Sequence, residues 1–279
     1  TGPTSTAAYA DTTLEGLVDL LRGVQSLEIP AGLYRINVRG GDGGSSAENS
    51  GGTAAIVSAT VSIPVGGTLH VLVGQRGGSG RYNGGGGGAT YVWLAGSSEP
   101  LVVAGGGGGA AASGDGGGAQ TGQSGGSCPR GSCGSRGTGG HGGSSSGGSY
   151  PGNPGAGWLD AAQSSGHQFC AGNDETSAPQ AQPPRSGGAG GGQDANADQA
   201  GDGGFGGGGG GQGGCNSAGG GGGGGYSGGA AVRDCCGAPG GGGGSFVAPS
   251  ATAVRRRRAG SGDGYVTLTC DVEIPSASG

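Results

Sequence analysis

Five unbroken glycine runs constrain the fold of this chain more than any other feature. An extended helix with three residues per turn has no internal hydrogen bonds, so its N–H and C=O groups point sideways. Such groups need partners on neighbouring segments when they are buried. Because glycine has no Cβ, several such helices can approach closely enough to bond to one another, and the sequence predicts a bundle of polyglycine helices. The runs are 84–88, 105–109, 206–211, 219–225 and 240–244.

Composition also permits a disordered chain. The 83 glycines and 13 prolines among 279 residues exceed the share of about 25–30% that is typical of low-complexity sequences. Against disorder, the runs return to large apolar residues at defined points, such as Tyr91, Tyr226 and Phe246. Collagen is excluded because no Gly-X-Y period runs through the chain. The absence of a recurring block of fixed length argues against silk-like repetition.

Alternating apolar residues predict β-strands near the two ends of the chain. Gly66 and Gly67 predict a hairpin between two of these strands. Residues 14–22 suggest one short helical segment, and the last strand is expected to complete the sheet begun near the N-terminus. The strand segments are 26–38, which holds two pieces around a turn, 57–63, 69–73, 91–94, 101–104 and 265–274.

These patterns predict an all-β fold in three parts. Residues 1–104 supply the N-terminal strands of a β-sandwich, residues 105–244 form a polyglycine-helix insertion, and residues 245–279 supply the closing strands. With aromatic residues at 4%, the conventional cores are expected to be small. The apolar islands around Trp158 and Phe169 are interpreted as lids or loop anchors, and 179–184 as an exposed loop.

The charge pattern limits the classes of partner. The formal net charge is −5 and is dispersed along the chain, so we expect no nucleic-acid partner. No apolar stretch has the length of a membrane-spanning helix.

One dense cluster stands out, and we name its residues the arginine run. It fits a proprotein-type cleavage site or a patch for acidic glycans, but a solvated loop before the last strand is the favoured interpretation. The run consists of Arg255, Arg256, Arg257 and Arg258.

Seven cysteines in a weakly hydrophobic chain predict disulfides and therefore an extracellular location. An odd number leaves at least one thiol free or bonded to another chain. Cys128 and Cys133 are spaced to close a small local loop. Of the adjacent Cys235 and Cys236, one is expected to have a distant partner. Cys270 is a candidate for that partner, or else a buried free thiol on a strand.

Catalytic and metal sites are not predicted. The chain has no CxxC pair and three histidines, so a zinc site is disfavoured. Glycine abundance makes G-x-G-x-x-G uninformative, and a phosphate-binding loop lacks its lysine. Asp-Gly fragments near Asp202 and Asp263 do not recur at nine residues, which disfavours calcium. No nucleophile elbow is present. We therefore expect no enzyme and no cofactor.

Several segments together resemble the extracellular glycine-rich module of the anaplastic lymphoma kinase and leukocyte tyrosine kinase receptors. In that family the module is a jelly-roll-like β-sandwich, similar to tumour necrosis factor, with a polyglycine helix bundle between its strands. The resemblance implies a disulfide between Cys170 and Cys215. The segments are 2–4, 23–25 with 29–31, 73–75, 84–92, 100–105, 203–206 with Cys215, and 225–229.

Three roles follow from this sequence. The first is a secreted structural or adhesive component of a coat, matrix or filament. Its partners would be other protein subunits, such as its own copies, or a surface protein or glycan. The second is a ligand-binding ectodomain, as the resemblance implies. The third is an adhesin of the kind found on phage tail fibres, with variable loops between glycine helices.

Overall fold

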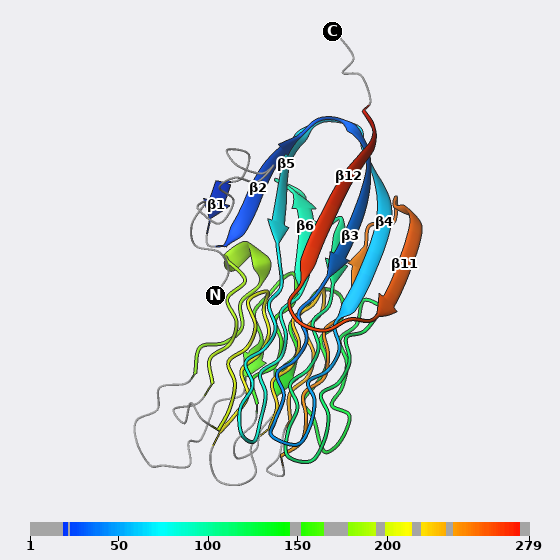
Figure 1. Cartoon of the computed structure of the whole chain (residues 1–279). Helices are drawn as coiled ribbons and strands as arrows, with labels where there is room; N and C mark the ends of the chain where they lie inside the picture. Colours follow the sequence, from blue (N-terminus) through cyan, green and yellow to red (C-terminus); the bar gives the residue numbers. More distant parts are fainter. Residues whose placement is uncertain are drawn as a thin grey trace, which may run out of the picture.

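The computed structural model describes residues 19–21, 23–145, 152–164, 178–193, 199–213, 219–232 and 237–273. The protein is nearly all β, with two antiparallel sheets packed together above a bundle of extended segments (Figure 1). A 3₁₀ helix spans Pro184–Ser186. The strands are β1 (Asp19–Leu21), β2 (Val24–Ile29), β3 (Gly32–Arg39), β4 (Ala55–Ile63), β5 (Gly67–Leu72), β6 (Thr90–Leu94), β7 (Val102–Ala104), β8 (Ser144–Ser145), β9 (Gln163–Ser164), β10 (Phe246–Val247), β11 (Thr252–Arg258) and β12 (Tyr265–Glu273).

The two large sheets share one apolar core. One sheet has the order β1-β2-β5-β6-β7-β10 and the other β11-β4-β3-β12. Alternation along β3 and β4 turns Ile36, Val57 and Val61 toward Leu69 and Val92 of the six-stranded sheet. Strand β12 pairs with β3, which confirms that the last strand completes the sheet begun near the N-terminus.

The predicted hairpin at Gly66 and Gly67 is wrong. Strands β4 and β5 belong to different sheets, so the intervening residues cross between the two layers. The antiparallel partners are instead β3 with β4 and β5 with β6. Each of these pairs is joined by a long excursion into the bundle, through residues 40–54 and 73–89. The outgoing and returning arms of an excursion are held in the bundle, and this places the two strands side by side.

The helical prediction for 14–22 is also wrong where it can be compared, because 19–21 form β1 and pair with β2. Residues 14–18 and 22 lie outside the described residues. A short isolated helix is unstable because its first turn fixes several residues for one hydrogen bond. Pairing with the edge of a sheet therefore suits these three residues better.

The glycine runs form a lattice with a period of three residues. In the run 84–88, residues three apart donate to the same neighbouring segment, as expected for a helix with three residues per turn. The N···O distances are 2.7–2.9 Å. The bonds are Gly84 to Ala110 and Gly87 to Gly107, Gly85 to Gly78 and Gly88 to Gln75, and Gly86 to Gly209.

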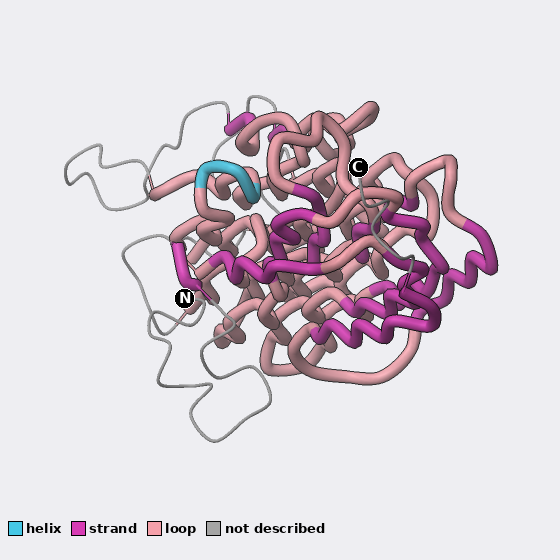
Figure 2. Tube along the Cα trace, turned by 90° about the horizontal axis from the view of Figure 1, so that it is seen from above, coloured by secondary structure: helices cyan, strands magenta, loops and turns pink. Residues whose placement is uncertain are grey.

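The carbonyl groups of the same run accept from three further segments. The run therefore has hydrogen-bonded neighbours on all sides, and 219–225 repeats the three-residue pattern. Figure 1 shows these segments running side by side below the strands, and Figure 2 shows them from above, beneath the sheets. The donors to 84–88 are Gly41 and Gly44, Gly204, and Gly221 and Gly224.

Close approach of the backbones explains the demand for glycine. A Cβ added to Gly107 would overlap the carbonyl oxygen of Gly52, and one added to Gly243 would overlap that of Gly224. In each case the obstructing atom is backbone and is itself part of the lattice. These positions therefore exclude every side chain, including a methyl group.

An aromatic layer joins the six-stranded sheet to the bundle. Tyr91 and Trp93 of β6 pack with Trp158, Phe205 and Tyr226, which come from loops of the glycine-rich region. The Tyr91 hydroxyl donates to the Gly225 carbonyl at 2.8 Å, and burial raises the pKa of this hydroxyl. Trp158 is fully buried, which agrees with its predicted role as a loop anchor.

A buried ion pair fastens the four-stranded sheet to the bundle. Arg39 and Asp42 are 3% and 8% exposed, and Nη2 of Arg39 lies 2.6 Å from Oδ1 of Asp42. Asp42 also accepts the N–H groups of Ala54 and Gly262 at 2.7 Å. Arg39 donates to the carbonyls of Gly262 and Asp263. The pair thus links the end of β3 to the loop between β11 and β12.

We predict that Gly107→Ala destabilises the protein by about 3 kcal/mol or more, because the methyl group overlaps lattice backbone. Denaturant unfolding measures the change. Gly122→Ala is the matched control, since no atom lies within 4 Å of its added Cβ, and we expect it to be neutral or stabilising by up to about 1 kcal/mol. Equal unfolding midpoints for the two variants would contradict the packing described above.

Arg39→Met should cost about 3–5 kcal/mol of unfolding free energy, because it leaves the Asp42 carboxylate buried without its partner. Arg35→Met serves as the control. It breaks the Arg35–Asp271 pair, whose arginine side chain is 64% exposed, and should cost about 0–1 kcal/mol. The same denaturant titration measures both variants. If Arg39→Met loses no more unfolding free energy than the control, the Arg39–Asp42 pair does not stabilise the contact between sheet and bundle.

Candidate functional site

The arginine run lies on a strand, so its prediction as a loop is wrong. Arg255, Arg256, Arg257 and Arg258 form most of β11 and pair with Ser58, Val57, Ile56 and Ala55 of β4. Every residue of β11 is exposed, so the strand has no buried face and shows no apolar alternation. The sequence pattern therefore hid the strand. Its use as a cleavage site or glycan patch stays a prediction.

Strand β11 is the edge of the four-stranded sheet, and its open side carries a row of positive charge. Residues directly opposite in an antiparallel pair share a face. Arg255 and Arg257 therefore lie on the outer face, and Arg256 and Arg258 on the face toward the other sheet. Neighbours on one face are about 7 Å apart along the strand. A bulge between Thr252 and Arg255 interrupts the pairing, a feature that discourages indiscriminate strand addition at sheet edges.

The outer face beside Arg255 is polar. Register aligns Arg255, Ser58, Asn37 and Thr267 in one cross-strand row, in which the Ser58 hydroxyl donates to Oδ1 of Asn37 at 2.7 Å. Asp271, also on β12, is paired with Arg35. The face thus presents hydroxyl and amide groups next to an edge of positive charge.

Cys128 and Cys133 are joined by a disulfide, the pair that the sequence offers for a local loop. The candidates Cys170 and Cys215, together with Cys235 and Cys236, lie outside the described residues. Cys270 is an exposed free thiol on β12, so the prediction that it is buried is wrong. Cys270 lies opposite Tyr34, on the face toward the other sheet, but β12 is an edge strand and the thiol stays exposed there.

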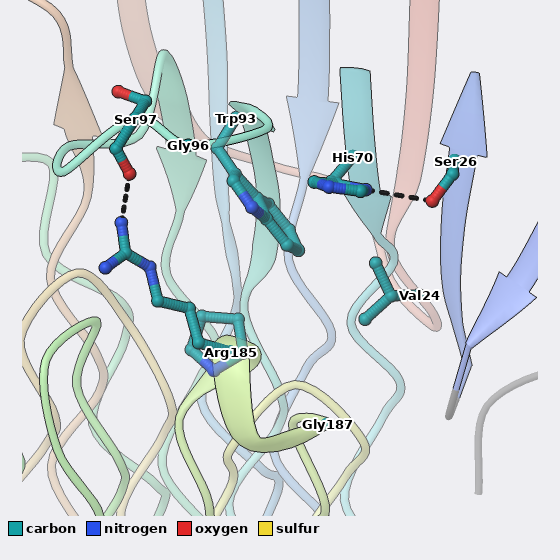
Figure 3. Close-up of a pocket in the computed structure, with 9 residues that line it drawn as sticks. Val24, Ser26, His70, Trp93, Gly96, Ser97, Arg185 and Gly187 are labelled. Atoms are coloured by element: carbon teal, nitrogen blue, oxygen red, sulfur yellow. Dashed lines mark hydrogen bonds between the residues drawn. The ribbon is translucent and has the colours of Figure 1, made fainter. Parts of the chain in front are cut away.

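The structure forms a pocket that no sequence pattern predicts. It lies beside β2, β5 and β6, next to the 3₁₀ helix, and encloses about 440 Å³ (Figure 3). Its lining residues come from parts of the chain that lie far apart in the sequence, and no motif links them. They are Val24, Ser26, His70, Trp93, Gly96, Ser97, Pro184, Arg185 and Gly187.

His70 is the titratable side chain on the strand side of the pocket. Its Nδ1 lies 2.9 Å from the Ser26 hydroxyl, and its ring centroid is 5.3 Å from that of Trp93. Burial lowers the pKa of His70, and the nearby Glu28 carboxylate partly opposes this shift. The imidazole is therefore mainly neutral at pH 7.

Metal and membrane sites are not seen in the described ranges. These contain no cluster of three or more His, Cys, Asp or Glu side chains suited to a metal ion. Nor does any helix in them have the length and hydropathy needed to cross a membrane.

No model of a known protein family matches this sequence, and neither does any characterised protein with which it was compared. The resemblance to the receptor-kinase module therefore stays a prediction that rests on the sequence segments themselves.

We predict that His70 titrates below its ordinary pKa of 6.5. The unfolded chain then binds this proton first, so the stabilisation from neutral His70 is complete above pH 6.5 and is lost as the pH falls toward the folded pKa. NMR titration of the ring measures the pKa. His70→Gln should lose less unfolding free energy than the wild type between about pH 7 and about pH 5. A titration midpoint at or above 6.5 would contradict the prediction.

Proposed function

We propose that this chain is a secreted, non-enzymatic structural or adhesive module of an extracellular coat, matrix or filament. The observation that carries the proposal is the arginine run on an open sheet edge, exposed on both faces and bordered at Arg255 by hydroxyl and amide groups. Guanidinium groups bind carboxylate and sulfate oxygens with two parallel hydrogen bonds. The partner proposed for this edge is an acidic polysaccharide.

The bundle supports a structural role in a different way. Its glycine segments bond to one another on every side, so the backbone of an extended region becomes a rigid support for the sandwich. The disulfide between Cys128 and Cys133 adds a local constraint and suits an oxidising extracellular location. Together they favour a module that carries load or presents a fixed surface.

Ligand binding by a receptor-type ectodomain is the second candidate. The pocket beside Trp93 is the observation that favours it, since concave sites with an aromatic wall and a few polar groups are typical of small-ligand binding. An adhesin of the phage tail-fibre type would use the loops at the far end of the bundle instead.

The test of the proposed function replaces all four residues of the arginine run by Gln. We expect binding to immobilised heparin to fall at least tenfold (about 1.4 kcal/mol). Binding by the wild type should weaken with salt, because exposed charges are screened. Neutral dextran should not bind. The measurement is surface plasmon resonance at several salt concentrations.

The matched control replaces four other exposed arginines by Gln, so that both variants have the same net charge. It should retain most of the affinity, and an equal loss in both variants would show that overall charge, not the strand, drives binding. Failure of the wild type to bind any acidic polysaccharide would overturn the proposal. The control positions are Arg76, Arg81, Arg130 and Arg136.

A further inference from the structure

The pocket of Figure 3 has one rigid aromatic wall. The rings of Trp93 and Trp158 meet edge to face with centroids 5.7 Å apart, and Trp158 Nε1 donates to the Ser98 carbonyl at 2.8 Å. Trp158 is fully buried and Trp93 nearly so. These contacts fix the position of the Trp93 ring, so the wall does not have to be ordered when a ligand enters.

The side chain of Arg185 is held in place at one end of this pocket. The Arg185 guanidinium lies over the Trp158 ring, 4.5 Å from its centroid, and donates one hydrogen bond to the Ser97 carbonyl. Arginine has five N–H donors. Within the described ranges the other donors have no protein partner. Arg185 is otherwise exposed, so its charge faces the pocket and solvent.

The strand side of the pocket offers neutral polar groups. The Ser26 hydroxyl is bonded to Nδ1 of His70, which leaves Nε2 of the imidazole without a partner among the described residues. Glu28 lies close enough to His70 to act on its pKa, so this side disfavours an anion. The pocket thus has a positively charged end at Arg185 and a polar end at His70, where an anion is disfavoured.

We propose that this pocket binds a carboxylated saccharide residue, such as a uronic acid. Its carboxylate pairs with Arg185, the C–H face of its ring packs against Trp93 and Pro184, and its hydroxyls bond to Ser26 and His70. A volume of about 440 Å³ is within the range of small-ligand pockets. A single cation suits a monoanion better than a phosphate dianion. The polar groups at the strand side suit hydroxyls better than the ring of an aromatic acid.

The test is NMR titration of the full chain with methyl glucuronoside, methyl glucoside and benzoate. We expect the glucuronoside to shift the Trp93 indole signal and to bind at least about tenfold more tightly than the other two. Arg185→Gln should reduce its affinity at least about tenfold, and Ser26→Ala should reduce it less. Equal affinity for the glucoside would overturn the carboxylate pairing, and tighter binding of benzoate would overturn the saccharide assignment.

Arg81→Gln is the matched control, since Arg81 also lies over an aromatic ring, 5.3 Å from the Tyr82 centroid. It should bind the glucuronoside like the wild type. Unfolding midpoints check that each variant folds. The variant lacking the arginine run should also keep this affinity, which separates the pocket from the proposed function. No shift at Trp93 with any ligand, or unchanged affinity in Arg185→Gln, would overturn the proposal.

Discussion

Lateral hydrogen bonding between glycine backbones is the interaction on which the rest of this structure depends. Ordering a glycine costs more entropy than ordering any other residue, so an isolated run would not stay extended. In the bundle each central run both donates to and accepts from its neighbours, and no side chain separates the backbones. The removal of every Cβ therefore permits the bonds that offset the entropy. The same close approach makes individual positions such as Gly107 intolerant of a methyl group.

The sandwich and the bundle stabilise each other. Strand β3 pairs with β4, and β5 with β6, although a long excursion through the bundle separates the two strands of each pair in sequence. The lattice thus brings the paired strands together, as a short turn does in a hairpin. In return, the sheets supply side chains that the bundle lacks. Tyr91 bonds to the Gly225 carbonyl, and the Arg39–Asp42 pair binds the first bundle segment to the loop before β12. The aromatic layer and the ion pair thus join the sheets to one end of a lattice that has almost no side chains of its own. Because residues 40–54 and 73–89 enter the bundle, the two parts interleave along the chain.

Much of the fold was predictable because alternation reports a strand with one buried face. This pattern located β4, β5, β6 and β12, and the glycine runs predicted segments that must bond sideways. It could not find β11, whose residues are exposed on both faces, nor β10, which has two residues. The crossing at Gly66 looked like a hairpin because local turn signals do not say which sheet a strand joins. Of the site residues, the arginine run was found by composition, whereas His70, Trp93 and Arg185 meet only in the folded chain.

Hydrogen exchange of the glycine amides in the native protein tests the lattice most directly. Residues 84–88, 105–109 and 220–225 should exchange at least about 10³-fold more slowly than in the denatured chain, because each amide is bonded to a neighbouring segment. Protection should be weaker at exposed glycines such as Gly122. Exchange of the three runs at random-coil rates, in a chain whose β-strand amides remain protected, would contradict the account.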